Sequence, residues 1–325
     1  MGLCRCRSAS TWTATAADFP VRARLSRIVD RLRSRICPSA EVPFADLPPE
    51  TAVRLAYQVV LGRDPDPTGL ADYGGRLAAG ELTPDGMVRE MFVAEEFEAR
   101  HVYPARFLHV SLHASRRDFV RGLPPARRIL DLGGGWKWSA EGALVVMGYP
   151  YAFEELVIVD LPSDDRHPLY RSEDHPPLET RLGPVRYDYR SMTDLSGHPD
   201  GSYDLIYSGQ SIEHVPPAEA DLVLKEAHRV LRPGGTLALD TPNAAVCRLQ
   251  QAEFVDPDHK VEYTHAEMRA KLTAAGFELV EEKGLNYCGE SVRTGVFSWE
   301  EAARNRGVFA SPEDCYLLAY VARKD

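Results

Sequence analysis

The chain has 325 residues, of which 44% are hydrophobic and 26% are charged, and its formal net charge is −10. This size allows more than one hydrophobic core, and the negative charge disfavours non-specific binding to nucleic acid or anionic lipid. The longest apolar runs fall far short of the roughly 18 residues that a membrane helix needs. Six scattered cysteines without a Cys-x-x-Cys pair exclude a disulfide-stapled fold and indicate a reducing, cytoplasmic setting.

Residues 1–43 form a basic segment that differs from the rest of the chain. They hold eight arginines against three acids, net +5, and Val21–Ile36 carries apolar residues at helical spacing with arginines between them. Such a stripe packs on the protein itself or on a partner, or else makes weak contact with an anionic membrane surface. A cleaved transit peptide has a similar composition. Met1–Pro20 has no apolar core, so we expect no secretory signal.

Residues 44–100 predict a small all-α domain. Helix-start signals occur at Pro49 and Pro84, and a turn dense in Pro, Asp and Gly separates the first helix from the second. We expect the Asp64–Gly69 stretch to cap a helix rather than to bind calcium, because Gly75 stands where a calcium loop requires Glu. The region resembles a small helical domain of uncharacterised function found in bacterial envelope and glycan proteins. The matching residues are Leu61–Asp66, Gly69-Leu70 and Ala94–Phe97.

Residues 101–325 alternate strand-like and helical stretches. Helices are expected at Pro217–Leu231 and His265–Ala275. The strand-like runs are Arg128–Leu132, Leu156–Asp160, Val185–Tyr189, Tyr203–Ser208, Thr236–Asp240, Phe277–Glu281 and Tyr316–Val321. This alternation predicts an α/β domain with a doubly wound, mostly parallel seven-stranded sheet, which binds ligands beyond the carboxyl ends of its strands.

The first predicted strand runs into three consecutive glycines, Gly133–Gly135, called the glycine loop below. Glycines at this place let the backbone turn tightly and approach a ligand. A dinucleotide fingerprint would need glycine at position 138, which is Trp138, and Lys137 is not followed by the Ser or Thr of a phosphate loop. Asp131, two residues before the loop, would disfavour a pyrophosphate and suits a ligand with an ammonium group.

A series of ordered motifs resembles the class I S-adenosylmethionine-dependent methyltransferases, in their type-11-like branch. The motifs are Asp131-x-Gly133-x-Gly135, Val157–Asp160, Tyr203–Val215, Glu226–Leu237 and Leu272-x-x-Ala275-Gly276-Phe277. One departure is Lys137, which stands where the family usually has a third glycine and leaves the shape of the loop open. The resemblance implies a Rossmann-like fold and S-adenosylmethionine as cofactor.

The resemblance also implies which residues contact that cofactor. In the family, an acid after the second strand accepts both ribose hydroxyls, here Asp160, and an acid after the third receives the adenine amino group. That second acid is Asp188, with Asp194 nearby as an alternative. The full set assigned to the cofactor is Asp131, Gly133, Gly134, Gly135, Asp160, Leu161, Asp188, Tyr189, Ser208 and Gln210.

The exit of the fourth predicted strand indicates the type of acceptor. Enzymes that methylate planar amino groups often carry Asn/Asp-Pro-Pro-Tyr there, whereas this chain has Ser208–Ser211. We therefore expect O-methylation, which requires a base for the hydroxyl proton. The expected substrate is a saccharide or a small hydroxylated metabolite. The expectation of a saccharide depends only on the glycan proteins in which similar helical domains occur. N- or C-methylation of a small molecule, or a degenerate adapter that binds cofactor without turnover, are the alternatives.

Three histidines or acids near the expected site are candidates for catalysis. His259, in the loop after the fifth predicted strand, is the predicted general base, with Asp258 beside it. His214 follows the fourth strand and is a second candidate, although its Glu-His pair is common enough in this branch to favour a structural or cofactor-facing role. The simplest alternative is that Thr264 caps the next helix and these charges lie on the surface.

Two further features concern metal and partners. No metal is the main expectation, but Asp256, Asp258 and His259 could hold a divalent ion that orients vicinal hydroxyls. The stretch Gly284–Pro312 is long enough to cover an acceptor pocket. We expect a small-molecule or glycan partner and no nucleic acid, and a homo-oligomer stays open.

Overall fold

The computed structural model describes residues 43–98 and 102–325. They divide into two compact units, the first ending at Tyr103 and the second spanning Pro104–Asp325. The predicted amphipathic stripe Val21–Ile36 lies outside the described residues. Within the described ranges, no helix combines the length and the apolar character needed to cross a membrane.

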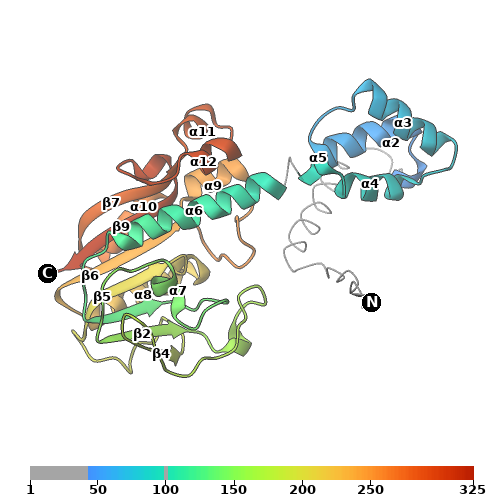
Figure 1. The fold of residues 1–325 in the computed structure, drawn as a ribbon. Helices are drawn as coiled ribbons and strands as arrows, with labels where there is room; N and C mark the ends of the chain where they lie inside the picture. Colours follow the sequence, from blue (N-terminus) through green and yellow to red (C-terminus); the bar gives the residue numbers. More distant parts are fainter. Residues whose placement is uncertain (1–42, 99–101) are drawn as a thin grey trace, which may run out of the picture. The chain divides into compact units, whose positions relative to one another are not determined.

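The first unit consists of short helices around a core of its own (Figure 1). The helices are η2 (Phe44–Asp46), α2 (Pro49–Ala56), the π-helical turn η3 (Tyr57–Leu61), α3 (Pro67–Ala78), α4 (Pro84–Phe92) and α5 (Glu95–Phe97). Val53 of α2 and Met87 and Met91 of α4 are fully or almost fully buried in this core. The predicted all-α character of this region is confirmed.

The Leu61–Asp66 turn of the first unit is fixed by two charged groups. Asp66 caps α3 by accepting a hydrogen bond from the Gly69 N–H at 2.8 Å, which confirms the predicted capping role. Arg63 donates two hydrogen bonds to the Glu96 carboxylate, at 2.6 and 2.8 Å. This bidentate pair ties the turn to the segment that closes the unit.

The second unit is built on one sheet, which has nine strands within the described residues. They are β1 (Arg128–Leu132), β2 (Glu155–Asp160), β3 (Leu178–Glu179), β4 (Pro184–Tyr189), β5 (Tyr203–Gly209), β6 (Leu231–Pro242), β7 (Phe277–Tyr287), β8 (Val308–Phe309) and β9 (Cys315–Lys324). In space the order is β3-β4-β2-β1-β5-β6-β9-β7-β8. All seven predicted strands are present, and the two-residue edge strands β3 and β8 are additions.

The central strands run in parallel, as predicted. β4, β2, β1, β5 and β6 pair in parallel, whereas β9 pairs antiparallel with both β6 and β7. The loops that follow β1, β2, β4, β5 and β6 therefore meet at one edge of the sheet, which we call the carboxyl edge. Every residue predicted to bind cofactor lies at or close to the end of one of these strands. Of the predicted catalytic residues, His214 follows β5 closely, whereas Asp258 and His259 lie further along the chain after β6.

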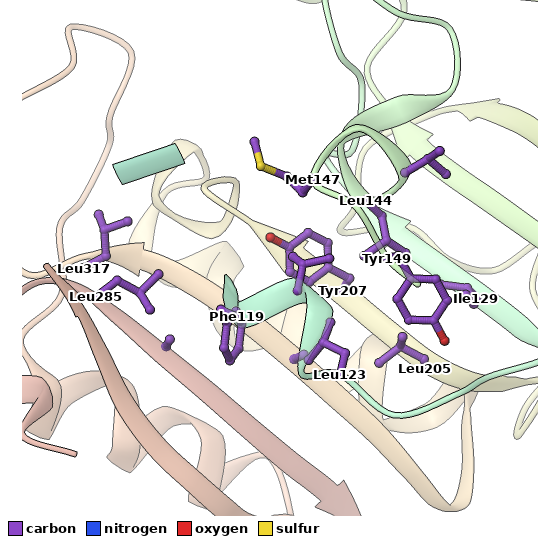
Figure 2. Packing of buried hydrophobic residues seen from close by; sticks show 14 of the residues in the cluster. Phe119, Leu123, Ile129, Leu144, Met147, Tyr149, Leu205, Tyr207, Leu285 and Leu317 are labelled. Carbon is purple, nitrogen blue, oxygen red and sulfur yellow. The ribbon is translucent and has the colours of Figure 1, made fainter. Parts of the chain in front are cut away.

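The two faces of the sheet carry separate hydrophobic cores, because residues alternate between faces along each strand. Ile129 and Leu205 join one core, shown in Figure 2, while their neighbours Leu130 and Ile206 join the other. The first core is covered by α6 (Tyr103–Arg121), α7 (Gly142–Val146), α9 (Ala244–Gln250) and α12 (Trp299–Arg304). The second is covered by α8 (Pro217–Val230) and α10 (His265–Ala274).

The stretch Gly284–Pro312 adds a short helix, α11 (Gly289–Thr294), before α12. Two of its aromatic residues pack on the first core. The Phe297 ring lies edge-on to Trp299, and its centroid is 5.9 Å from that of Tyr316, a core residue. These two side chains thus extend the core. The cysteines Cys247, Cys288 and Cys315 are free and buried.

Candidate active site

The glycine loop turns sharply at the end of β1. A Cβ on Gly134 would lie 2.2 Å from the Asp131 carboxylate, and one on Gly135 would lie 2.0 Å from Asp160 Oδ2. Gly133 has φ +72°, which a residue with a side chain rarely adopts. The loop therefore requires glycine at each position and passes directly over two carboxylates.

Asp131 is fully buried beneath the loop. Its Oδ2 accepts a hydrogen bond from the Leu144 N–H at 3.3 Å, while Oδ1 has no hydrogen-bond partner. Burial raises the pKa of Asp131 to about 7. A buried carboxylate with an unpartnered oxygen is suited to a cationic or hydrogen-donating ligand.

Asp160 lies at the end of β2 and faces the glycine loop. Oδ2 accepts the Gly135 N–H at 3.0 Å and Oδ1 accepts the Leu161 N–H at 2.8 Å. Burial raises its pKa, against the opposing effects of Arg166 and of these two N–H donors. Since a carboxylate has about four lone-pair sites, Asp160 retains capacity for two more donors, such as vicinal hydroxyls.

At the end of β4, the side chains of Asp188 and Tyr189, both predicted to bind cofactor, have different surroundings. Tyr189 stacks on Tyr187 with ring centroids 5.4 Å apart, and the Arg166 guanidinium lies over the Tyr189 ring at 5.6 Å. Asp188, between them, instead forms an ion pair with Arg190 at 2.8 Å and accepts a hydrogen bond from His198 at 3.0 Å. The carboxylate assigned to the adenine amino group is thus engaged by two side chains of its own chain.

Arg166 is a residue that the sequence pattern did not point to. It is buried, its Nε donates to the Leu161 carbonyl at 2.7 Å, and it lies 3.6 Å from Asp160. Its Nη1 donates to Ser172 Oγ at 2.6 Å, while Nη2 has no hydrogen-bond partner. The loop after β2 therefore places a cation beside the predicted ribose-binding acid.

The exit of β5 touches the glycine loop through Ser211. Ser211 Oγ donates to the Leu132 carbonyl at 2.7 Å and contacts Ser208 Oγ at 2.6 Å, and a Cβ on Gly133 would lie 2.5 Å from Ser211 Cβ. Gln210 has φ +56°, an uncommon value for a residue other than glycine. Its amide donates to Asp240, so this strained backbone is held in place by the side chain.

Asp240 accepts hydrogen bonds from three side chains in a buried network that the sequence motifs did not predict. Arg116 of α6 donates to Oδ1 at 2.7 Å, Gln210 donates to the same oxygen at 2.9 Å, and Tyr207 donates to Oδ2 at 2.7 Å. Arg116 and Asp240 are 124 positions apart in the chain, so no local motif connects them. The network ties α6 to the ends of β5 and β6.

Directly after Ser211, the structure brings together Glu213, His214, Asp258 and His259, called the histidine cluster below. His214 Nδ1 lies 3.0 Å from Asp258 Oδ2, and the His214 and His259 rings meet edge to face with centroids 5.0 Å apart. The predicted catalytic residues therefore lie together, although 44 positions separate His214 from Asp258. Glu213 is the member that the sequence interpretation passed over.

His259 is buried among acids. Nδ1 lies 2.9 Å from Glu262 Oε1, and Nε2 lies 4.0 Å from Glu213 Oε1. Burial lowers the pKa of His259, but the Glu262 hydrogen bond and the charges of Glu213 and Asp256 outweigh it, so the pKa is raised overall. These contacts favour the protonated ring, the form that cannot accept a proton.

The acids of the same loop have other partners. Asp256 Oδ2 accepts the Tyr170 hydroxyl hydrogen and Oδ1 accepts the Asp258 N–H, while Asp258 also pairs with Lys260. Side-chain atoms able to bind a metal converge instead from Glu213, His214 and His259. Downstream, Thr264 and Glu267 form a capping box at α10, which confirms the predicted cap.

Two family models match the chain. The description "Methyltransferase domain" fits residues 147–239, and "Domain of unknown function (DUF4214)" fits residues 44–101. The second match covers the helical unit, and the first covers the middle of the sheet.

Curated relatives carry methyltransferase names. A probable S-adenosylmethionine-dependent methyltransferase of Mycolicibacterium smegmatis is 35% identical over 127 residues, covering 38% of this chain but only 49% of that protein. A ubiquinone biosynthesis O-methyltransferase of Xanthomonas axonopodis is 27% identical over 235 residues, covering 68% and 86%. Among solved structures, a possible histamine N-methyltransferase of Thermotoga maritima gives a TM-score of 0.47 at 16% identity, covering 70% and 97%.

The described residues fit S-adenosylmethionine, the cofactor that the name of the Mycolicibacterium relative gives. The glycine loop passes over Asp131, whose Oδ1 is buried without a partner, and over Asp160, which retains free acceptor capacity. The chain carries a methyltransferase domain, matched over residues 147–239, preceded by a DUF4214 domain at residues 44–101.

Proposed function

We propose that the protein transfers the methyl group of S-adenosylmethionine to a hydroxyl oxygen of a small metabolite or saccharide. One observation carries this proposal: the histidine cluster begins two residues after Ser211, the residue that contacts the glycine loop. A group able to activate a hydroxyl is therefore adjacent to the place where the cofactor is expected.

Each part of the carboxyl edge has a task in this proposal. S-adenosylmethionine, when bound, supplies a methyl group made electrophilic by its sulfonium. Asp160 would accept the ribose hydroxyls, and Asp131 would face the cationic end. Ser208 and Ser211 fix the exit of β5 against the glycine loop, which positions the histidine cluster.

The histidine cluster would orient the acceptor and assist loss of its proton. His214 is its partly exposed histidine, with 23% of the side chain accessible, whereas His259 is buried. Asp258 orients the His214 ring by bonding Nδ1, which leaves Nε2 directed elsewhere. His214, rather than the sequence-predicted His259, is thus the member best placed to meet an acceptor.

Support for oxygen as the acceptor atom comes from two sides. The exit of β5 lacks the Asn/Asp-Pro-Pro-Tyr sequence that often serves planar amino groups. Several Xanthomonas relatives are named O-methyltransferases, at 27% to 29% identity. A saccharide acceptor rests on the DUF4214 domain alone, through the bacterial envelope proteins that it resembles.

The test is incubation of the purified chain with ¹³C-methyl S-adenosylmethionine and fractionated hydroxylated metabolites and glycans, read by NMR. The proposal predicts a new methoxy signal that His214→Ala reduces by at least about 100-fold, the usual scale for a group acting on the proton. His228→Gln, a change on α8 at a histidine that packs on Phe277, should leave the signal intact. N-methyl products, or cofactor binding with no transfer to any fraction, would contradict the proposal.

A further inference from the structure

Glu213 is a fully buried carboxylate with an unmet bonding requirement. Oε2 accepts the Thr241 hydroxyl hydrogen at 3.0 Å, but Oε1 has no hydrogen-bond partner. Leaving a buried charged oxygen unpartnered is costly in a folded protein. The oxygen faces His259, whose Nε2 is 4.0 Å away.

The distance between these two atoms is informative. A direct N–H···O hydrogen bond spans about 2.7–3.2 Å, so 4.0 Å is too long for one. Ligand atoms bonded at about 2.1 Å to one cation lie roughly 3–4 Å apart. One ligand atom from each of Glu213, His214 and His259 lies within 4.8 Å of the other two, so small side-chain shifts would close the site.

Both imidazoles are already oriented as metal ligands usually are. His214 Nδ1 is 3.0 Å from the Asp258 carboxylate, and His259 Nδ1 is 2.9 Å from the Glu262 carboxylate. Metal-binding histidines typically donate the other ring N–H to a carboxylate or carbonyl, which fixes the tautomer and leaves the remaining nitrogen for the metal. A single general base would need only one such histidine–carboxylate pair, whereas two adjacent pairs are typical of a metal site.

We propose that Glu213 Oε1, His214 Nε2 and His259 Nε2 form a binding site for one divalent transition-metal ion. Two imidazoles and one carboxylate suit Mn²⁺, Fe²⁺, Co²⁺ or Zn²⁺ better than Mg²⁺ or Ca²⁺, which prefer oxygen ligands. The ion lies between Glu213 Oε1 and His259 Nε2, which are 4.0 Å apart. Of the three ligands, His214 is the one whose side chain is partly exposed.

The function of this ion rests on the methyl transfer proposed above. With Nδ1 bonded to Asp258 and Nε2 bound to the metal, His214 assists proton loss through the ion and does not accept the proton itself. An acceptor hydroxyl bound to the cation loses its proton to solvent water more readily, because the positive charge stabilises the alkoxide. The oxygen then forms its bond to the methyl carbon as the carbon–sulfur bond breaks, with that electron pair remaining on sulfur. The site thereby selects acceptors whose oxygens can bind a metal, such as vicinal diols or catechols.

The test is a Co²⁺ titration of the full chain after chelator treatment, followed by calorimetry and visible absorption. We expect one Co²⁺ per chain with absorption bands of nitrogen ligation. Glu213→Gln, which retains an oxygen acceptor for Thr241, should weaken binding at least about 10-fold. Glu219→Gln, an exposed acid on the first turn of α8, is the matched control and should bind as the wild type does.

Thermal unfolding separates loss of the site from loss of the fold. Without metal, Glu213→Gln should unfold at the same or a higher temperature than wild type, since it removes an unpartnered buried charge. Absence of saturable Co²⁺ binding, or equal binding by wild type and Glu213→Gln, overturns the metal site. If methyl transfer also proceeds fully in chelator, only this inference fails; if S-adenosylmethionine itself does not bind, the proposed function fails and the Co²⁺ result still decides the metal site.

Discussion

Asp131 lies buried at the centre of the sheet, where a Cβ on Gly134 would come within 2.2 Å of its carboxylate. Burial raises its pKa from 3.8 to about 7, so the folded chain retains a proton that the unfolded chain has already lost. A residue that is unfavourable for the fold and located under the loop proposed to bind the cofactor is typical of functional sites.

This pKa predicts a pH dependence of stability. Between about pH 4 and 7 the native state binds more protons than the unfolded state, so the free energy of unfolding falls as pH rises, by up to about 1.4 kcal/mol per pH unit. Asp131→Asn should remove this contribution, so the free energy of unfolding of the variant should rise relative to that of wild type as pH increases across that window. Urea unfolding at several pH values measures it, and parallel profiles for the two proteins would contradict the assignment.

At the scale of elements, the long strands were predictable, whereas several helices of the second unit, α6 among them, were not. The central parallel strands are buried on both faces and therefore appear in the sequence as continuous apolar runs. Helix α6 has no such pattern, because its buried side includes Ser111, Ser115 and Arg116 among apolar residues. A buried arginine becomes understandable only when Asp240, distant in the chain, is seen beside it.

The Arg116–Asp240 pair should therefore be essential for the position of α6. Arg116→Met retains the apolar stem but leaves Asp240 buried beside only Tyr207 and Gln210, and we expect the free energy of unfolding to fall by about 3–5 kcal/mol. Chemical denaturation measures this. Arg117→Met, at the next and exposed position, should change it by less than about 0.5 kcal/mol; similar losses in the two variants would argue against the pair.

Several residues of the candidate site could be predicted from the sequence, but the contacts between them could not. The glycine loop and Asp160 carry local signals, since they follow buried strands directly. His214 and His259 were recognised as candidates, but their Asp258 and Glu262 partners and the role of Glu213 depend on how separate loops meet. Arg166 was missed because it lies in a loop without a motif.

At the scale of the whole molecule, the chain consists of two units with separate hydrophobic cores. The family matches follow the same division, with one model within each unit. The methyltransferase chemistry proposed here draws only on residues of the second unit.

Separate cores predict separable stability. Met87 is completely buried in the first unit, so Met87→Ala should cost that unit about 2–5 kcal/mol. We expect calorimetry to show a lower unfolding temperature for one transition only, with S-adenosylmethionine binding unchanged. A joint shift of both transitions, or weaker cofactor binding, would show that the units are coupled.

The most direct test of the whole account is calorimetric titration of the purified chain with S-adenosylmethionine. We predict one binding site per chain, weakened about 10- to 100-fold in Asp160→Ala by the loss of charged hydrogen bonds to the ribose. Asp165→Ala, an exposed acid in the same loop, should bind as tightly as wild type. No binding by the wild type, or equal binding by Asp160→Ala, would contradict the claim that the glycine loop and Asp160 form the cofactor site.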